Sequence, residues 1–192
     1  MILKPIFKHI VFKNFSPILV EEYLEGALEV DVDALYDGER GWIAGIMEHF
    51  EPLGIHSGDS ACVLPPVSLS PDILYQLKEQ TLHIAQVLNV RGLLNVQFAI
   101  YNNQILVIEA NPRASRTVPY VSKALGVPVA QIAAKISLGA RLDEFDLPSF
   151  EDLLYFSVKQ PVFSFNRFKD ISTQLGPIMK STGEVMGDFF KF

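Results

Sequence analysis

Two apolar stretches that meet at Asn102-Asn103 constrain the fold more than any other feature of the chain. Residues 93–101 and 104–110 are rich in β-branched side chains. The asparagine pair between them tolerates the left-handed backbone that a tight turn requires. The pattern therefore predicts two antiparallel strands joined by a short turn.

A second hairpin is predicted upstream. From Glu29 onward acidic and apolar residues alternate strictly, so that Glu29, Asp31 and Asp33 share one face of a strand. Asp37-Gly38 is typical of a two-residue hairpin turn, and residues 41–47 fit the returning strand. An acidic strand face of this kind is usually solvated, and only one of the three acids need be functional.

Three helices are predicted from their end signals and their apolar periodicity. Ser70-Pro71 is a favourable helix start, and apolar residues close to one face extend that helix to about Leu88. Residues 117–125 and 128–138 fit two further helices, each ended by the glycine that follows it.

The remaining segments are predicted to be loops and short strands. A loop rich in Gly, Ser, Asp and Pro is expected over residues 50–66, and a short strand around residues 155–162. Antiparallel hairpins combined with helices indicate an α+β fold, in which an antiparallel sheet is packed against helices.

Composition excludes several classes of protein. Of the 192 residues 49% are hydrophobic, which is too many for a disordered chain. The formal net charge is −6 and no basic cluster is present, which argues against nucleic acid as a partner. No apolar run approaches the roughly 18 residues of a membrane span, and lysines interrupt any apolar core of a signal peptide near the start.

The single cysteine, Cys62, excludes an intrachain disulfide and favours a reducing compartment. Its simplest role is that of a small buried hydrophobic residue. We therefore expect a cytoplasmic protein.

The end of the second predicted hairpin carries candidate metal ligands. Glu109 and Asn111 are two residues apart on a strand, so their side chains point to the same face. Both offer the hard oxygen atoms that Mg²⁺ or Mn²⁺ prefers. The alternative is that Glu109 belongs to the polar face of a half-exposed strand.

Whether Gln97 joins this pair depends on the hairpin register. A three-residue turn, or a bulge, places Gln97 opposite Glu109 and on the same face. A two-residue turn with regular pairing turns Gln97 away. Asn102 or Asn103 in a left-handed conformation permits the first arrangement.

Arg113 and Arg116 stand just beyond this strand. A planar guanidinium suits phosphate or carboxylate groups. A carboxylate that binds metal, next to two arginines, is what stabilisation of a transferring phosphoryl group requires.

The loop over residues 54–60 is a second candidate site. Its two glycines and small polar residues let backbone N–H groups turn toward an anion or a base edge, although such a loop is often only structural. Within it, His56 fits a ligand, a base or an ordinary loop histidine.

Taken together, the motifs resemble the large chain of carbamoyl-phosphate synthase, over about residues 18–187. Six segments carry the resemblance: EVDVD at 29–33, GIHSGDS at 54–60, RGLLNVQ at 91–97, IEANPRASRTVP at 108–119, VSKALGVP at 121–128 and STGEVMG at 181–187. The resemblance is closest to the second, C-terminal ATP-grasp unit, the half that phosphorylates carbamate. Other ATP-grasp ligases carry elements similar to Glu-x-Asn-Pro-Arg, but the His-Ser-Gly-Asp-Ser loop favours carbamoyl-phosphate synthase.

The resemblance implies the position of a nucleotide. Glu29 would bind the ribose of ATP, and Glu22 and Leu24 would lie along the adenine. Position 22 often holds a histidine in this family, where this chain has Glu22. The loop over the nucleotide would consist of Gly54, Ile55, His56 and Ser57.

The resemblance also implies the reaction, which is phosphoryl transfer from MgATP to carbamate. Gln97, Glu109 and Asn111 would hold the Mg²⁺ or Mn²⁺ ions that bridge the phosphates. Arg113 and Arg116 would meet the phosphate or carbamate side and, with Asn111, form the catalytic group.

Three segments are expected along the chain. Residues 1–17 are a divergent or truncated N-terminal segment without the glycine-rich lid of the family. Residues 18–147 are the C-terminal lobe of an ATP-grasp unit, and residues 148–192 lead toward an absent regulatory domain. The implied partners are the remainder of the large chain and a glutamine amidotransferase small chain, and the isolated chain is expected to have weak activity or none.

Two other interpretations stay open. The chain fits a non-catalytic remnant or assembly module that keeps the fold without turnover. It also fits a different ATP-grasp ligase whose substrate is a carboxylate instead of carbamate.

Overall fold

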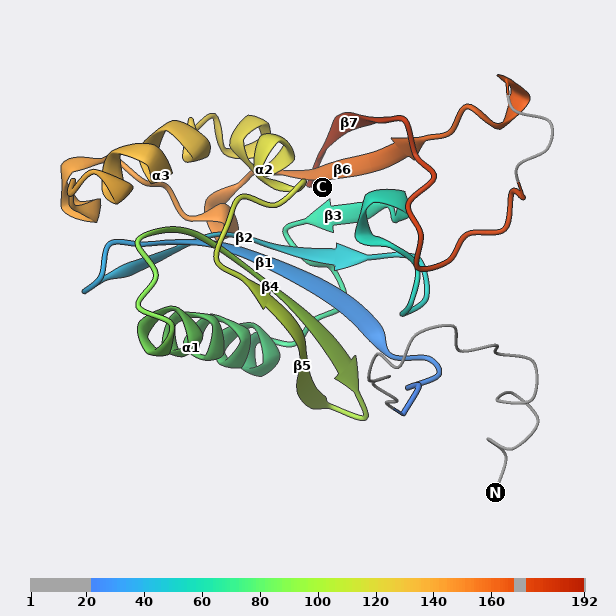
Figure 1. Cartoon of the computed structure of the whole chain (residues 1–192), viewed down its shortest axis with the longest axis horizontal. Coiled ribbons are helices and arrows are strands. Elements are labelled where there is room, and N and C mark those ends of the chain that lie inside the picture. The colour runs from blue at the N-terminus through green and yellow to red at the C-terminus, as the bar shows by residue number, and fades with distance from the viewer. Residues whose placement is uncertain (1–21, 168–171, 192) are drawn as a thin grey trace, which may run out of the picture.

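The computed structural model describes residues 22–167 and 172–191, and its main feature is one seven-stranded antiparallel sheet (Figure 1). The strand order across the sheet is β5-β4-β1-β2-β3-β6-β7. The strands are β1 Leu28–Tyr36, β2 Gly41–His49, β3 Cys62–Leu64, β4 Gly92–Tyr101, β5 Gln104–Asn111, β6 Tyr155–Val162 and β7 Gly183–Phe190. The expected α+β class, with an antiparallel sheet and packed helices, is confirmed.

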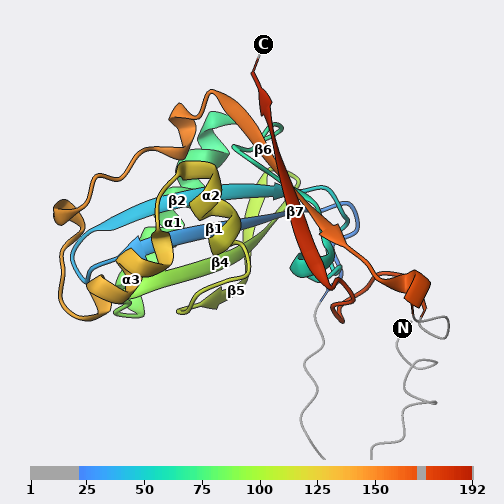
Figure 2. The same cartoon turned by 90° about the horizontal axis from the view of Figure 1, so that it is seen from above.

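Helices cover both faces of the sheet. Helix α1 (Pro71–Val87) lies on one side of the central strands, and α2 (Val118–Leu125) and α3 (Val129–Ser137) lie on the other (Figures 1 and 2). Short 3₁₀ helices occupy Ser57–Asp59, Leu142–Glu144, Phe150–Asp152 and Phe165–Arg167. No helix in the described ranges is both long and apolar enough to cross a membrane.

The predicted helix ends are confirmed. The Ser70 side chain accepts a hydrogen bond from the Ile73 N–H at the start of α1, and Pro71 occupies the first turn. Gly126 ends α2 in the left-handed conformation, with φ of 68°. Gly139 follows α3 with φ of 106°.

The turn of the β4–β5 hairpin has two residues. Asn102 and Asn103 both have positive φ, 49° and 63°, and Tyr101 pairs with Gln104 across the turn. A bulge lies further along the hairpin, between the Gln97–Glu109 and Phe98–Val107 pairs. This bulge brings Gln97 opposite Glu109, so the predicted pairing is present although the turn itself is the shorter one.

The β1–β2 connection is longer than predicted. Tyr36 pairs with Gly41, which leaves four residues, 37–40, in the turn instead of two. The Asp37 side chain accounts for the longer turn, since its Oδ1 accepts hydrogen bonds from the N–H groups of Glu39 and Arg40 at 2.9 and 2.7 Å.

The segment expected to be a loop over residues 50–66 also contains β3, and β3 pairs with both β2 and β6. Strands β6 and β7 thereby continue the same sheet. The expectation for residues 1–17 lies outside the described residues.

Candidate functional site

A cleft of about 530 Å³ opens between the start of β1, the loop after β2 and the β4–β5 hairpin. All of the residues predicted to bind nucleotide line it: Glu22, Leu24, Glu29, Gly54, Ile55, His56, Ser57, Gln97 and Glu109. Tyr23, Leu53, Leu106, Ile108 and Pro177 are among the lining residues that the sequence did not indicate. The structure therefore brings together segments that are as much as 155 positions apart, between Glu22 and Pro177.

A smaller polar cavity of about 120 Å³ adjoins the cleft. Four residues line both spaces: His56, Ser57, Gln97 and Glu109. The smaller cavity adds three predicted residues, Asn111, Arg113 and Arg116, and five further ones, Asp31, Asn95, Ser115, Thr117 and Lys159. In this way every predicted site residue lies in one of two connected spaces.

The sheet register explains why the polar residues share one face. Gln97 pairs with Glu109 on one side and with Asp31 on the other, and the next row contains Asn111, Asn95 and Asp33. Side chains of paired residues project to the same side of a sheet. The two rows therefore form one polar patch across β5, β4 and β1.

The predicted metal-binding groups are in contact. The Asn111 side-chain amide donates a hydrogen bond to Glu109 Oε1 at 2.8 Å, and Gln97 is the direct cross-strand partner of Glu109. This places carboxylate and amide oxygens on one face of the sheet, which is the donor set that Mg²⁺ and Mn²⁺ prefer.

The acidic face of β1 is buried, which contradicts the solvated strand face expected from its alternation. Glu29, Asp31 and Asp33 are 5%, 2% and 0% exposed. The loop over residues 54–60 covers one end of this face, and the segment before α2 covers the other. Alternation identified the shared face, but it does not report what packs on that face.

Burial changes the acid strength of Glu29. Desolvation raises the pKa of this carboxyl from 4.5 to about 7, although the nearby His49 and Lys159 act against the rise. Glu29 therefore titrates near neutral pH at the edge of the cleft.

Asp33 anchors the segment that carries the arginines. Its carboxylate accepts hydrogen bonds from Asn95 Nδ2 at 2.9 Å, Ser115 Oγ at 2.8 Å and Thr117 Oγ1 at 2.5 Å. Burial raises the pKa of Asp33 to about 6, and these hydrogen bonds limit the rise. Because Arg116 lies between Ser115 and Thr117, this network fixes its backbone next to the smaller cavity.

Arg113 and Arg116 line the smaller cavity from the segment after β5. Arg113 Nη1 donates a hydrogen bond to the carbonyl oxygen of Ala114 at 3.0 Å. Within residues 22–167 and 172–191, neither guanidinium forms an ion pair with a carboxylate. Both groups are therefore available to an anionic ligand.

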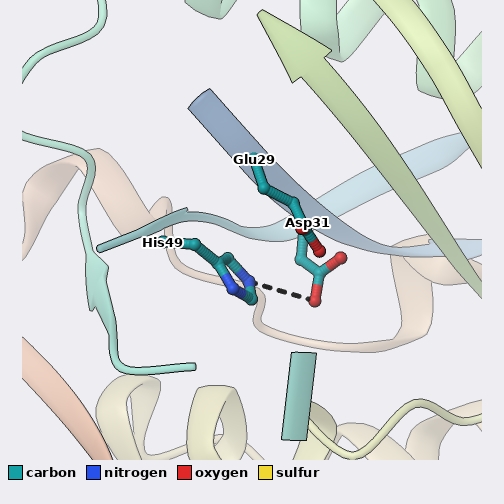
Figure 3. Close-up of side chains that lie close together, drawn as sticks. All are labelled: Glu29, Asp31 and His49. Carbon is teal, nitrogen blue, oxygen red and sulfur yellow. Dashed lines mark ion pairs between the residues drawn. The ribbon is translucent and has the colours of Figure 1, made fainter. Parts of the chain in front are cut away.

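A buried cluster of ionisable groups lies beneath the cleft (Figure 3). Glu29 and Asp31 project from β1, and His49 projects from the end of β2, with donor atoms within 4.8 Å of one another. His49 Nε2 lies 3.3 Å from Asp31 Oδ2. Asp31 Oδ1 and His49 Nδ1 have no hydrogen-bond partner among the described residues. The alternation pattern could have indicated Asp31, but no sequence signal indicated His49.

The loop at residues 54–60 is held by a segment that is distant in the sequence. The His56 N–H donates to the carbonyl oxygen of Gly176 at 2.9 Å, and the buried Asp59 carboxylate accepts hydrogen bonds from the N–H groups of Lys180 and Ser181. The His56 ring caps the short helix that follows, since its Nδ1 accepts a hydrogen bond from the Gly58 N–H at 3.0 Å. Here His56 is an ordered structural residue that also lines both spaces.

Cys62 is fully buried, as expected, and burial raises the pKa of its thiol to about 12. The thiol is therefore protonated and unreactive at neutral pH. It takes no part in the chemistry of the cleft.

The fold and cleft define the class of protein. The structure is similar to the biotin carboxylase domain of a single-chain bacterial carboxylase, with a TM-score of 0.62 over 72% of this chain and 33% of the other, at 16% identity. This likeness assigns the sheet and its helices to the ATP-grasp fold.

A family model for the carbamoyl-phosphate synthase L chain, ATP-binding domain, matches residues 9–145. The chain therefore belongs to this family. It is 55% identical over 182 residues to the carbamoyl phosphate synthase large chain of Acidobacterium capsulatum, a match that covers 92% of this chain and 17% of that relative. The large chain of Archaeoglobus fulgidus is 52% identical over 177 residues, covering 92% of this chain and 16% of the relative. The chain thus spans about one sixth of the length of these relatives.

Proposed function

We propose that this chain is the lobe of a carbamoyl-phosphate synthase large chain that binds ATP and metal for the phosphorylation of carbamate. The reaction transfers the terminal phosphoryl group of MgATP to carbamate and yields carbamoyl phosphate and ADP. The observation that carries the proposal is the convergence of all the predicted site residues on two connected spaces.

The larger cleft is suited to a nucleoside. Leu24, Leu106 and Ile108 give it an apolar lining, which favours a planar base, while Glu29 offers oxygen acceptors for the hydroxyls of a ribose. Glu22 lies at the same wall and is exposed. The backbone of residues 54–57 closes the other side.

Gln97, Glu109 and Asn111 would hold Mg²⁺ or Mn²⁺ where the two spaces meet. Their oxygen atoms fit the preference of these ions, and Glu109 supplies the negative charge. An ion held by these residues would supply positive charge next to the phosphates of ATP.

The chain's own residues supply positioning and charge in this reaction. Arg113 and Arg116 would bind the oxygen atoms of the phosphoryl group or of carbamate and stabilise the charge that spreads over them. The Asn111 amide would donate a hydrogen bond to the same oxygens. The loop at residues 54–57 would exclude water from the nucleotide.

The proposal includes the setting of the enzyme. The lobe belongs to the second ATP-grasp unit, acts with the rest of the large chain and a glutamine amidotransferase small chain, and serves arginine and pyrimidine biosynthesis in the cytoplasm. The share of the relatives that the chain spans supports the need for further parts.

The reverse reaction tests the proposal in the complete large chain that contains this segment. Incubation with MgADP and carbamoyl phosphate should produce ATP, and Arg116→Met should reduce the rate by about 100-fold. Arg40→Met is the matched control, because Arg40 is exposed and, among the described residues, forms an ion pair only with Asp143, and this variant should keep the parent rate. Equal ATP formation from acetyl phosphate would instead indicate a carboxylate ligase.

A further inference from the structure

Lys159 is a buried lysine beside the cleft that no motif indicated. It lies on β6 in the same row as Cys62 and His49, so its side chain projects to the polar face of the sheet. The residue is only 2% exposed and lines the smaller cavity. Its Nζ donates a hydrogen bond to the carbonyl oxygen of Ser57 at 3.0 Å.

A buried ammonium group is costly unless charges and hydrogen bonds compensate it. The compensation here comes from the acidic face of β1. Glu29 and Asp31 are buried nearby, and the charge of Lys159 acts on the Glu29 carboxyl and on the Cys62 thiol. The charge of Lys159 therefore acts on the acidic strand, while its hydrogen bond holds the loop over the cleft.

The hydrogen bond from Lys159 adds to other anchors of the loop. His56 and Asp59 hold the loop to the segment over residues 176–181. Lys159 holds Ser57, and Ser57 lines both the cleft and the smaller cavity.

We propose that Lys159 is a positioning residue, which fixes the Ser57 backbone so that the loop over residues 54–57 meets the nucleotide in register with Glu29. This inference rests on the proposed function for the nucleotide, but not on the identity of the phosphoryl acceptor. Lys159 acts through Ser57 and needs no contact of its own with ATP.

The test uses the 192-residue chain and the variants Lys159→Met and Lys159→Arg. The first readout is the ¹⁵N resonance of Gly58, whose peptide group contains the Ser57 carbonyl. The second is the Kd of MgATP measured by calorimetry on folded samples. Lys78→Met is the matched control, because Lys78 lies on α1 and pairs with Glu151 away from the cleft.

We expect Lys159→Met to shift the Gly58 resonance and to weaken MgATP binding about tenfold, the equivalent of one hydrogen bond to a charged group. Lys159→Arg keeps the charge and the donors and should recover part of the affinity, which a purely steric role would not predict. Lys78→Met should change neither readout. Parent-like affinity and an unchanged Gly58 resonance in Lys159→Met would overturn the inference.

Two further outcomes are distinguishable. If the parent chain binds no MgATP, the proposed nucleotide site fails, whereas the Gly58 resonance still reports the contact between Lys159 and the loop. If Lys159→Met does not fold, the ammonium resonance of Lys159 in the parent replaces it. That resonance should shift when MgATP is added, and its failure to shift in a chain that binds MgATP would overturn the positioning role.

Discussion

Substitution of Asp33 by asparagine should remove a defined part of the pH dependence of stability. The carboxylate is fully buried, and three side chains donate hydrogen bonds to it. An asparagine has the same shape, and the Thr117 hydroxyl can reverse its role and accept a hydrogen bond from the new amide. Asp33→Asn therefore removes the charge while it leaves the surrounding network largely satisfied.

The magnitude follows from the acid strength of Asp33. Burial raises its pKa from 3.8 to about 6, so the folded protein resists ionisation more than the unfolded chain does. The contribution of Asp33 to the free energy of unfolding is fully present below pH 3.8 and is lost as the pH rises through 6. The whole loss corresponds to about 3 kcal/mol, of which about 2 kcal/mol falls between pH 4.5 and 7.5.

Thermal unfolding between pH 4.5 and 7.5 measures this difference. Relative to the parent, Asp33→Asn should lose less stability as the pH rises, by about 2 kcal/mol or about 4–8 °C in Tm for a domain of this size. Asp143→Asn is the control, because this carboxylate is 61% exposed, and its curve should run parallel to that of the parent. Parallel curves for Asp33→Asn and the parent would show that burial does not raise the pKa of the Asp33 carboxyl.

Two other predictions concern the cleft and the core. Burial raises the pKa of Glu29 to about 7, so only about a tenth of this carboxyl is ionised at pH 6. The Kd of MgATP should therefore be about tenfold higher at pH 6 than at pH 8. Calorimetry on Glu29→Gln checks this, because this variant should keep only the pH dependence that comes from the nucleotide's own phosphate. The Tyr120 hydroxyl donates a buried hydrogen bond to the Ser157 carbonyl oxygen at 2.6 Å, so Tyr120→Phe should lower the free energy of unfolding by about 1–3 kcal/mol, whereas Tyr75→Phe at a 62% exposed position should leave urea unfolding unchanged.

Periodicity predicted the parts of the fold that local rules determine. The alternation in β1 and the Asn102-Asn103 turn predicted two hairpins, and the cap residues predicted the helix ends. The sequence does not decide between a longer turn and a bulge, because either one pairs Gln97 with Glu109.

Tertiary packing determined what the sequence could not show. The three acids of β1 have the pattern of a solvated strand face, yet a loop and the segment before α2 cover them. Strand β3 has only three residues, and its pairing with β6 joins segments almost a hundred positions apart, as in the pair of Cys62 and Lys159. No local signal specifies such a pair, and for this reason the sequence did not indicate Lys159.

The proposed function requires that this lobe bind nucleotide through the face around Glu109. Thermal unfolding of the 192-residue chain with and without MgATP tests it most directly, next to Glu109→Ala and the control Glu151→Ala. Glu151 is half exposed, pairs with Lys78 and lies outside both spaces.

At about 100 times its Kd, MgATP should add roughly 2.7 kcal/mol to the free energy of unfolding, a rise in Tm of several degrees. We expect this rise for the parent and for Glu151→Ala, and its loss in Glu109→Ala. An equal rise in Glu109→Ala, or no rise in a folded parent chain, would contradict it.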